Sequence, residues 1–457
     1  MYPKNTYELD AGIGLNKETV GRISDLKAES PLLRRYRQQA LGRYEQTRMP
    51  LHWAPEAIRE IDFQSFRYYT APANDNGEGV SWEGLQLPIR RRLADIGVAE
   101  EDKAGHLGGF RAQLNGESVY ARLREELEDQ GIIFVDPSEG LNRYGDLFRK
   151  WYGRVVPAAD SVLSALNAAV FSGGNFIYIP PGVKVKRPLK GFLHLEGAHC
   201  GQFGRSLIIA DEGAEVTFIE SCTSARSNGP NLHASVGELV ALPGAKIQYV
   251  SIQNWSPNVY NLVTLRGWAY EDAEIRWIDA NIGGRLTMKY PGIILKEPGA
   301  RGEMLSIAVA ANGQYQDTGA KMMHAADNTK STITSKSISK GTGRADYRGW
   351  VKVDPLRRRC TNHTECDALL IDSNSRTDTY PAISVTGGNG NSFEHEATVT
   401  RISAEQLFYM RQRGLSAQEA LSLSVNGFVN DLIRAFPVEY STQLKRLIEL
   451  EMEGTVG

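Results

Sequence analysis

The residues best suited to chemistry in this chain are its cysteines and a pair of acidic residues around a histidine. Late in the sequence, the stretch FEHEATVTR at 393–401 places His395 between Glu394 and Glu396. Iron accepts thiolate, imidazole and carboxylate ligands, and soft sulfur suits iron-sulfur chemistry. The chain has no CxxC pair, which favours free thiols over a disulfide framework or a preformed zinc site, and its four cysteines are Cys200, Cys222, Cys360 and Cys366.

Cys366 lies in HTECDALLI, flanked by two acidic residues and near the start of a predicted strand. A buried cysteine is most often only a small apolar residue, so a chemical role needs further support. The FEHEA segment follows about 30 residues later, close to one coil of the repeat described next, and stacked coils bring such residues together. We therefore predict that Cys366 faces Glu394 or Glu396, with His395 as a further candidate. Two thiols and a carboxylate fall short of the four cysteines of a stable cluster, so the predicted site is labile or shared with another chain.

A repeat in the middle of the chain would position these residues. From residue 173 the pattern changes to short β-prone runs such as FIYI, VTFIES, IQYVSIQ and IRWIDAN. A turn precedes an alanine and then a strand at Ala214, Ala245, Ala273 and Ala300, which are 31, 28 and 27 residues apart, and Asn328 continues the spacing 28 residues later. This spacing predicts a β-helix or rolled sandwich whose coils stack on one another. An antiparallel sandwich remains the alternative, because periodicity alone does not separate the two kinds of pairing.

Helical patterns flank the repeat on both sides. Residues 15–48, 88–130 and 137–172 have helical spacing, interrupted by a loop at 70–79. After residue 400, capping boxes begin two helices, at Ser403 with Gln406 and at Ser416 with Glu419; Gly414 is placed to end the first helix, Pro437 follows the second, and STQLKRLIELEMEG forms a third. These C-terminal helices either dock a partner or pack on their own sheet. The predicted domains are therefore a helical one at 1–172, a β core at 173–400 and a helical one at 401–457.

Composition narrows the classes of function. The chain has 457 residues, of which 41% are hydrophobic and 23% charged, and its net charge is −2. These values are typical of a multidomain globular protein and argue against a nucleic-acid-binding surface. There is no apolar run of about 20 residues and no signal-peptide pattern at the N-terminus, so we expect a cytoplasmic protein that does not span a membrane.

Motifs for several enzyme classes are absent from the sequence. It contains no GxxxxGK[ST], GxSxG or HExxH motif, and no GxGxxG between a strand and a helix. ATP hydrolysis, acyl transfer, zinc proteolysis and dinucleotide binding therefore lack their residues. Any use of ATP must come through a partner protein.

Several longer segments allow a comparison with a known family. The chain contains GQFGRSLIIADEGAEVTFIESCT, LHASVGELVAL, QNW, QDTGAKMMH, TECDALLI, FEHEAT and ISAEQLFYMRQRGL. Together they resemble the SufB/SufD family of the SUF iron-sulfur cluster assembly machine, over nearly the whole chain. The HEA pattern and the cysteine before the DxLL strand resemble the SufB scaffold branch more than SufD. The resemblance implies a mainly β fold, with a central right-handed β-helix between N-terminal and C-terminal helical regions.

The resemblance also implies partners and roles for individual residues. It implies a non-enzymatic scaffold for de novo assembly of a transient iron-sulfur cluster, with a sulfur donor protein, a SufC-type ATPase docked on the C-terminal helices, and a SufD-type subunit or a second copy of this chain at the β-helix edge. Cys222 resembles the cysteine that accepts persulfide sulfur, and Gln253 and Trp255 resemble residues lining the sulfur route. Cys366 with Glu396 resembles the cluster-assembly pair, and His395 is the adjacent, weaker candidate. This is coherent chemistry, because a thiolate accepts sulfur by exchange.

The sequence departs from the family pattern at a few positions. No cysteine precedes Cys200, so an N-terminal cluster held by a CxxC-type motif is excluded. His194 and Glu196 replace a common Arg and Asn, Leu265 replaces a common Lys, and Ser375 replaces a further cysteine. The first three changes alter residues along the expected sulfur route. The change at Ser375 leaves Cys366 as the main thiol at its end of the repeat. We expect Cys200 and Cys360 to be structural.

Two other functions remain as alternatives. In a β-helix polysaccharide hydrolase or lyase, Glu394 and Glu396 would act as acid and base, since residues two apart on a strand face the same way at about 6.5 to 7 Å, within the range for such pairs. In a purely structural SufD-like subunit, no cluster would form with any partner. The missing signal peptide argues against the polysaccharide enzyme, and the cysteine pattern argues against the SufD-like subunit.

Overall fold

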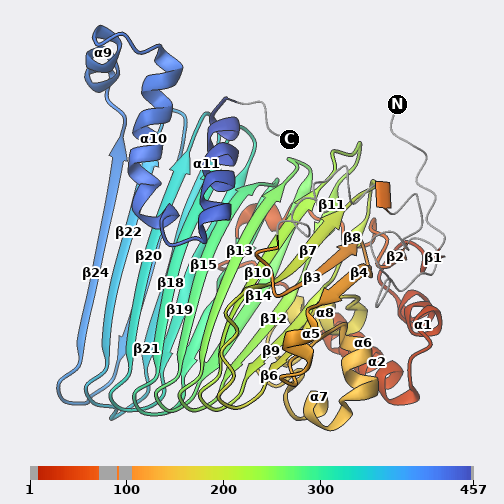
Figure 1. The fold of residues 1–457 in the computed structure, drawn as a ribbon. Helices are drawn as coiled ribbons and strands as arrows, with labels where there is room; N and C mark the ends of the chain where they lie inside the picture. Colours follow the sequence, from red (N-terminus) through yellow and green to blue (C-terminus); the bar gives the residue numbers. More distant parts are fainter. Residues whose placement is uncertain (1–8, 72–89, 92–104, 454–457) are drawn as a thin grey trace.

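The computed structural model describes residues 9–71, 90–91 and 105–453. Its centre is a β-solenoid in which two sheets of parallel strands face each other, with helices at both ends of the chain (Figure 1). This arrangement confirms the prediction of a mainly β fold with a central β-helix, and parallel pairing excludes the antiparallel alternative. The loop predicted at 70–79 lies largely outside the described residues, as does part of the helix predicted at 88–130.

The first sheet has ten strands, and all its neighbours pair in parallel except β3 and β4 at one end. Its strands are long and in register, so equivalent residues of successive coils lie side by side. In spatial order the strands are β4 (Glu117–Leu123), β3 (Gly109–Leu114), β7 (Leu189–Leu195), β10 (Glu215–Ser224), β13 (Lys246–Trp255), β15 (Glu274–Gly283), β18 (Arg301–Ala310), β20 (Lys330–Ser339), β22 (Thr361–Leu370) and β24 (Ser392–Arg401).

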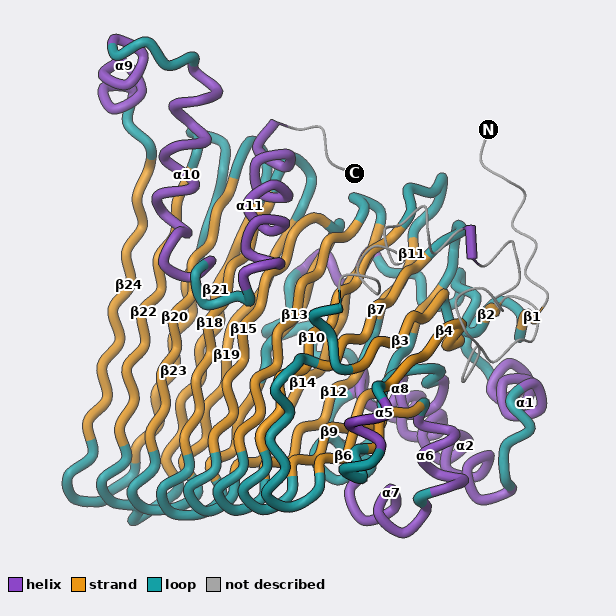
Figure 2. The backbone as a smooth tube through the Cα atoms, in the orientation of Figure 1, coloured by secondary structure: helices purple, strands orange, loops and turns teal. Residues whose placement is uncertain are grey.

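The second sheet forms the opposite wall of the solenoid and has twelve strands, several of them short (Figure 2). Its strands are β5 (Ile133–Val135), β6 (Phe176–Ile179), β8 (Gly201–Gln202), β9 (Arg205–Ala210), β11 (Asn231–His233), β12 (Val236–Ala241), β14 (Val259–Ala269), β16 (Leu286–Lys289), β17 (Gly292–Leu295), β19 (Tyr315–His324), β21 (Arg344–Val353) and β23 (Thr379–Val385). A separate antiparallel pair joins β1 (Leu9–Asp10) to β2 (Thr70–Ala71).

The repeated turns explain the spacing found in the sequence. Each turn places a residue in the left-handed region just before a strand of the first sheet, as at Gly244 with φ 70° and Gly299 with φ 77°, where the missing Cβ removes the steric penalty. The next residue, an alanine in four coils, is fully buried between coils. Asn328 is one residue out of this register. It takes the left-handed position itself, with φ 57°, and Thr329 occupies the alanine position.

The N-terminal region is partly helical, as predicted for 15–48 and 137–172. One expectation is wrong: residues 109–123, within the helix predicted at 88–130, form the β3–β4 hairpin, which closes the first sheet. Helices α1, α2 and α8 cover apolar residues on the outer face of the second sheet. The helices are α1 (Lys17–Leu26), α2 (Pro31–Gln46), the 3-10 helix η1 (Glu56–Glu60), α5 (Glu125–Glu128), α6 (Pro137–Arg143), α7 (Gly145–Trp151) and α8 (Val162–Val170).

Three helices follow the last strand, namely α9 (Ala404–Gln412), α10 (Ala417–Ile433) and α11 (Val438–Glu453). Both predicted capping boxes are present, because Ser403 and Ser416 exchange hydrogen bonds with the residues three positions later. Gly414, with φ 95°, ends the first helix as predicted. α10 and α11 pack on the outer face of the first sheet, where Leu444 and Ile448 are fully buried. α9 buries no residue and extends beyond the sheet (Figure 1).

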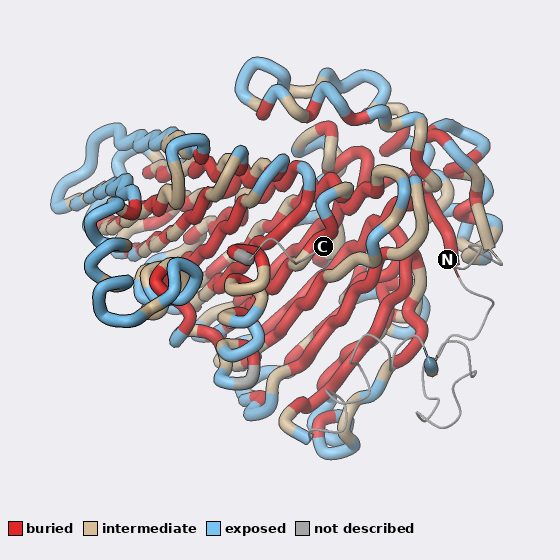
Figure 3. The backbone as a smooth tube through the Cα atoms, turned by 90° about the horizontal axis from the view of Figure 1, so that it is seen from above, coloured by how far each residue is buried: buried red, intermediate tan, exposed pale blue. Residues whose placement is uncertain are grey.

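The interior of the solenoid is apolar along the first half of β10, β13, β15 and β18, whereas β20 and β22 carry the buried polar residues Ser331, Asn362 and Thr364 there. Phe218, Tyr249 and Trp277 stack in successive coils, with ring centroids 5.5 Å and 5.0 Å apart. Buried residues run along most strands, whereas exposed residues gather at turns, on the outer helices and on the last strands, β23 and β24 (Figure 3). Within the described part of the chain, none of the helices combines the length and apolar character needed to cross a bilayer.

Candidate functional site

The second half of each strand in the first sheet carries polar residues into the interior. One position per coil forms a row that we call the polar column, and the register places its members side by side along six strands. From β10 to β22 they are Glu220, Ser251, Asp279, Ser306, Ser335 and Cys366. Every member is at most 5% exposed. The column therefore ends at one of the two cysteines singled out in the sequence.

Cys222 begins a second row, two residues further along β10 and on the same face as Glu220. Its partner in β13 is Gln253, followed by Asn281 in β15. Cys222 is fully buried. Burial raises the pKa of its thiol well above the usual value, with Glu220 and Asp279 adding to the increase and Lys289 opposing it. The structure thus joins both predicted cysteines by one polar strip.

Gln253 lies beside Cys222 in register, and Trp255 follows two residues later on the same face of β13. The Trp255 indole donates to Gln253 Oε1 at 3.3 Å, and Asn261 Nδ2 donates to the same oxygen at 2.6 Å. These two donors fix the orientation of the Gln253 amide. The His233 ring lies 4.7 Å from the Trp255 ring, and its Nδ1 lies 3.1 Å from Gln202 Oε1. Cys222 therefore has ordered polar neighbours, and it also belongs to an apolar cluster with Leu193, Leu195 and Val259.

Several polar atoms along this interior have no hydrogen-bond partner within the described ranges. They are His233 Nε2, Gln253 Nε2, Asn261 Oδ1, Asn281 Oδ1, Ser306 Oγ and Gln316 Oε1. Buried polar groups normally find a partner, and those that lack one in the protein bind water or a polar ligand. A solenoid interior lined in this way is suited to a small polar cargo, whereas an apolar core would exclude it.

At the far end of the column, Cys366 faces the interior on β22 and is 5% exposed. Burial raises the pKa of its thiol to about 12, and the Tyr347 hydroxyl of the opposite sheet partly offsets this increase. β24 is the edge strand, and its Ala397 lies beside Cys366 in register. Because strand residues alternate between faces, His395 shares the interior face with Cys366. Burial lowers the His395 pKa, and its Nε2 has no partner among the described residues.

The predicted pairing of Cys366 with Glu396 is not formed within the chain. Glu396 lies beside Glu365 in register and so points to the outer face of the sheet, opposite to the thiol. Glu394 shares that outer face, where its carboxylate lies 3.3 Å from His363 Nδ1. The physical reason is the two-residue alternation of a strand, which separates a histidine from both of its acidic neighbours. His395, the weaker candidate, is the residue of this stretch that accompanies Cys366.

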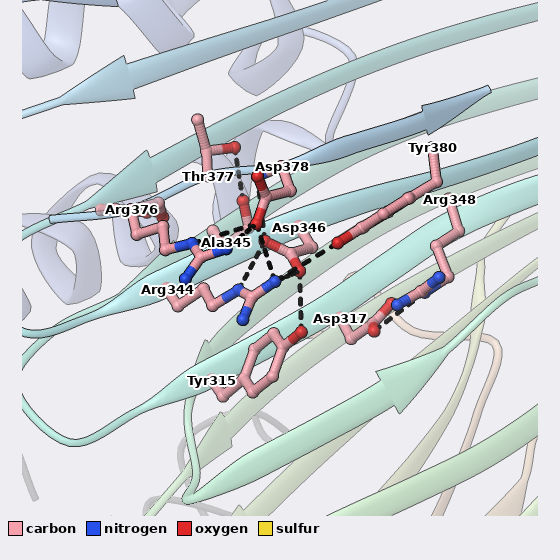
Figure 4. A network of polar contacts seen from close by, with 11 residues as sticks. Tyr315, Asp317, Arg344, Ala345, Asp346, Arg348, Arg376, Thr377, Asp378 and Tyr380 are labelled. Carbon is pink, nitrogen blue, oxygen red and sulfur yellow. Dashed lines mark hydrogen bonds and ion pairs between the residues drawn. The ribbon is translucent and has the colours of Figure 1, made fainter. Parts of the chain in front are cut away.

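A network on the outer face of the second sheet fixes the coil that carries Tyr347 (Figure 4). Asp346 is buried and accepts from the Tyr315 hydroxyl at 2.7 Å and from Arg344 Nε at 3.0 Å. Arg344 also reaches Asp378 of the next coil at 2.7 Å. These bonds tie β19, β21 and the segment before β23 together, and they hold Tyr347, on the opposite face of β21, against the Cys366 thiol.

Sequence reasoning missed the charged interior residues. Lys289 is fully buried, and its ammonium donates to Ser251 Oγ at 2.8 Å and to Asp279 Oδ1 at 2.5 Å, across the interior. The sequence repeat could have revealed the polar column, because Glu220, Ser251 and Asp279 each follow a repeat alanine by six residues. Cys200 and Cys360 are both buried, and Cys360 occupies the alanine position of its coil.

Comparisons with known proteins identify the family of this chain. Residues 193–428 match the family model described as SUF system FeS cluster assembly, SufBD core domain, and residues 111–190 match that of the SufBD protein N-terminal region. An iron-sulfur cluster assembly SufBD family protein of Staphylococcus saprophyticus is 43% identical over 97% of this chain and 94% of its own length. The iron-sulfur cluster assembly protein SufB of Bacillus subtilis is 42% identical over the same shares. The chain therefore belongs to the SufBD family of iron-sulfur cluster assembly proteins.

Proposed function

We propose that this protein is a scaffold that accepts sulfur at Cys222, passes it through the solenoid interior and assembles a transient iron-sulfur cluster at the Cys366 end. The observation that carries the proposal is the polar column, which leads from the strand of Cys222 to Cys366 without an apolar interruption. A cluster-assembly scaffold needs both a sulfur acceptor and a site for iron. Cys366 ends this column, and Cys222 lies two residues beyond Glu220, which begins it.

The distance between the two thiols determines how sulfur can travel. Five strand steps separate β10 from β22, and at about 4.8 Å per step this gives about 24 Å. Direct attack of one cysteine on the other is therefore excluded. Hydrosulfide, as a small carrier, would attack the outer sulfur of the Cys222 persulfide, release the Cys222 thiolate and form a hydrodisulfide. The Cys366 thiolate would then attack that species, break its S–S bond and return hydrosulfide, with no net redox change.

At the receiving end, Cys366 and His395 supply a sulfur and a nitrogen ligand from the interior face of the edge. Glu396 is a carboxylate on the outer face of the same edge strand, and we propose that it attracts iron there. Three side chains are fewer than a stable cluster requires, so the cluster would be transient and completed by a partner. β23 and β24 are edge strands with exposed residues, which suits pairing with a SufD-type subunit or a second copy of this chain.

The C-terminal helices support a role for an ATPase partner. α9 exposes Phe408 and Tyr409, which are 63% and 60% exposed, and Leu423 of α10 is 58% exposed. Large exposed apolar residues of this kind mark interaction surfaces. We propose that a SufC-type ATPase docks there and supplies all use of ATP, and that the protein works in the cytoplasm with a sulfur donor protein. Because Cys222 is fully buried, delivery by a protein donor requires a local opening of the chain around β10.

Anaerobic reconstitution with Fe²⁺ and sulfide tests the cluster site. We expect the wild-type protein to gain visible absorbance and Cys366→Ala to lose it while keeping its circular dichroism and melting temperature. Cys360→Ala is the matched control, because Cys360 is also a buried thiol but occupies the position where other coils have alanine. Equal absorbance in Cys366→Ala and wild type would remove the site assignment. No absorbance in any partner combination would favour a SufD-like structural subunit.

A further inference from the structure

Lys289 is a charged residue of the interior that the sulfur route leaves without a role. It lies on β16 of the second sheet, is fully buried and reaches across the interior to Ser251 and Asp279 of the polar column. An ammonium group has three N–H donors. Two of them have acceptors within the described part of the chain, which leaves one available for a further acceptor.

Lys289 is one of several charged or titratable groups of the interior near Cys222. Lys289 and Asp279 form an ion pair with both side chains at most 1% exposed. Glu220, two coils from Asp279 along the column, has a raised pKa because of burial, with Tyr249 and Lys289 acting in the opposite direction. His233 has a pKa of about 3 because of burial and of Lys289, so it is neutral. Lys289 is thus the cation that faces Cys222 from the opposite wall.

The nearest polar groups complete a pocket for an anion. Gln253 lies beside Cys222 in register, its Oε1 is occupied by two donors, and its fully buried Nε2 has no acceptor among the described residues. An amide N–H₂ and an ammonium N–H without acceptors, both inside a low-dielectric interior, favour a negatively charged ligand. The thiol of Cys222 is the group in this neighbourhood that becomes such an anion during sulfur transfer.

We propose, on the basis of the function proposed above, that Lys289 and the Gln253 amide form an anion pocket that holds the persulfide of Cys222 in its ionised form. In the loading step the Cys222 thiolate attacks the outer sulfur of a donor persulfide. The donor S–S bond breaks, a new S–S bond forms on Cys222, and the departing donor thiolate takes the persulfide proton. Lys289 compensates the negative charge on sulfur before and after the step, and acts as a positioning residue without itself being modified.

The test compares two variants in the full-length protein with inorganic hydrodisulfide as the probe under anaerobic conditions. Mass spectrometry of the Cys222 peptide follows the gain of one sulfur atom at several pH values. Lys289→Met removes the cation but leaves Asp279 unpaired, so Lys289→Met/Asp279→Asn removes both charges and relieves that structural cost. Lys330→Met, at an exposed position of β20, is the control for loss of a lysine.

We expect Lys289→Met to load Cys222 at least about tenfold more slowly at neutral pH, with the rate profile shifted to higher pH by about one unit or more, since one pKa unit is a factor of ten in thiolate population. The double variant also removes Asp279, which raises the Cys222 pKa, so its shift should have the same direction but be smaller. The double variant should recover the wild-type melting temperature without recovering the rate. A double variant with the wild-type rate and pH profile would show that Lys289 serves only as the partner of Asp279. A wild-type protein that gains no sulfur at Cys222 would instead overturn the proposed function, and the pocket with it.

Discussion

Blocking the solenoid interior between the two cysteines should separate sulfur acceptance from cluster assembly. Ser306 lies in the polar column near its midpoint, is 2% exposed, and its hydroxyl has no partner within the described residues. Replacing it with leucine removes no hydrogen bond seen in the structure and fills part of the interior with an apolar side chain. Overpacking of this kind costs about 1–3 kcal/mol, which a solenoid with extensive stacking should tolerate.

The geometry sets the expected size of the effect. Ser306 is three strand steps from β10 and two from β22, so a plug there lies about 14 Å from one end and about 10 Å from the other. Neither cysteine is contacted directly, and the Cys222 site keeps its surroundings. We therefore expect Ser306→Leu to load Cys222 at the wild-type rate and to reduce sulfur arrival at Cys366 at least about tenfold, which corresponds to an effective barrier higher by roughly 1.4 kcal/mol.

The assay supplies labelled persulfide and hydrosulfide, stops the reaction at intervals and measures sulfur on the Cys222 and Cys366 peptides by mass spectrometry. Thr334→Leu is the matched control, because it adds a similar side chain next to the column residue Ser335 but on the outer face of β20. Wild-type arrival of sulfur at Cys366 in a folded Ser306→Leu protein would refute transport along the column.

Three further predictions concern stability and reactivity. Glu238→Gln should lower the free energy of unfolding in urea by about 3–5 kcal/mol, because it leaves the fully buried Arg205 guanidinium without its charged partner; a loss below 1 kcal/mol would contradict this reasoning. Ser416→Ala should cost about 1 kcal/mol by removing the capping box with Glu419 at the start of α10, measured by thermal unfolding, and an unchanged melting temperature would count against it. Cys366 should react with iodoacetamide at pH 8 about a thousandfold more slowly than in the unfolded chain, since a pKa of about 12 leaves little thiolate, and its rate should rise about tenfold per pH unit up to pH 11; similar rates in the folded and unfolded chains would contradict the burial argument.

The sequence repeat predicted the architecture because turns and buried alanines have strict local requirements. A left-handed residue followed by a small buried one recurs in every coil that the alanine spacing marked. Asn328 continued the spacing but stands one position early, since an asparagine tolerates the left-handed region and can replace the glycine of the turn. An offset of one residue is invisible in a spacing count, yet it decides which side chains share a row.

The register of the last two strands explains the error at the Cys366 site. The spacing correctly brought FEHEA beside Cys366, but strand alternation makes His395, and not Glu396, the residue on the face of the thiol. To predict which residue shares the face of the thiol, the strand register must be known to within one residue. The capping boxes of the C-terminal helices, by contrast, depend on neighbours three positions apart and were predicted in full.

Two features depended on contacts that no local pattern contains. The segment at 109–123 has helical spacing but forms a hairpin, because β3 extends the first sheet beside β7 and so covers the end of the solenoid. Tertiary pairing outweighs local propensity there. Lys289 gave no signal either, since a lysine in a short strand is ordinarily exposed, and its burial depends on Asp279 from the opposite sheet.

The most direct measurement of the central claim follows a single labelled sulfur atom through the protein. A donor protein that carries a labelled persulfide and is too large to enter the solenoid is mixed with wild type and with Cys222→Ser, and it is removed before unlabelled hydrosulfide is added. The account predicts that label appears first on Cys222 and then on Cys366 in the wild type, and that Cys222→Ser acquires none on Cys366. Equal labelling of Cys366 in both proteins would contradict it.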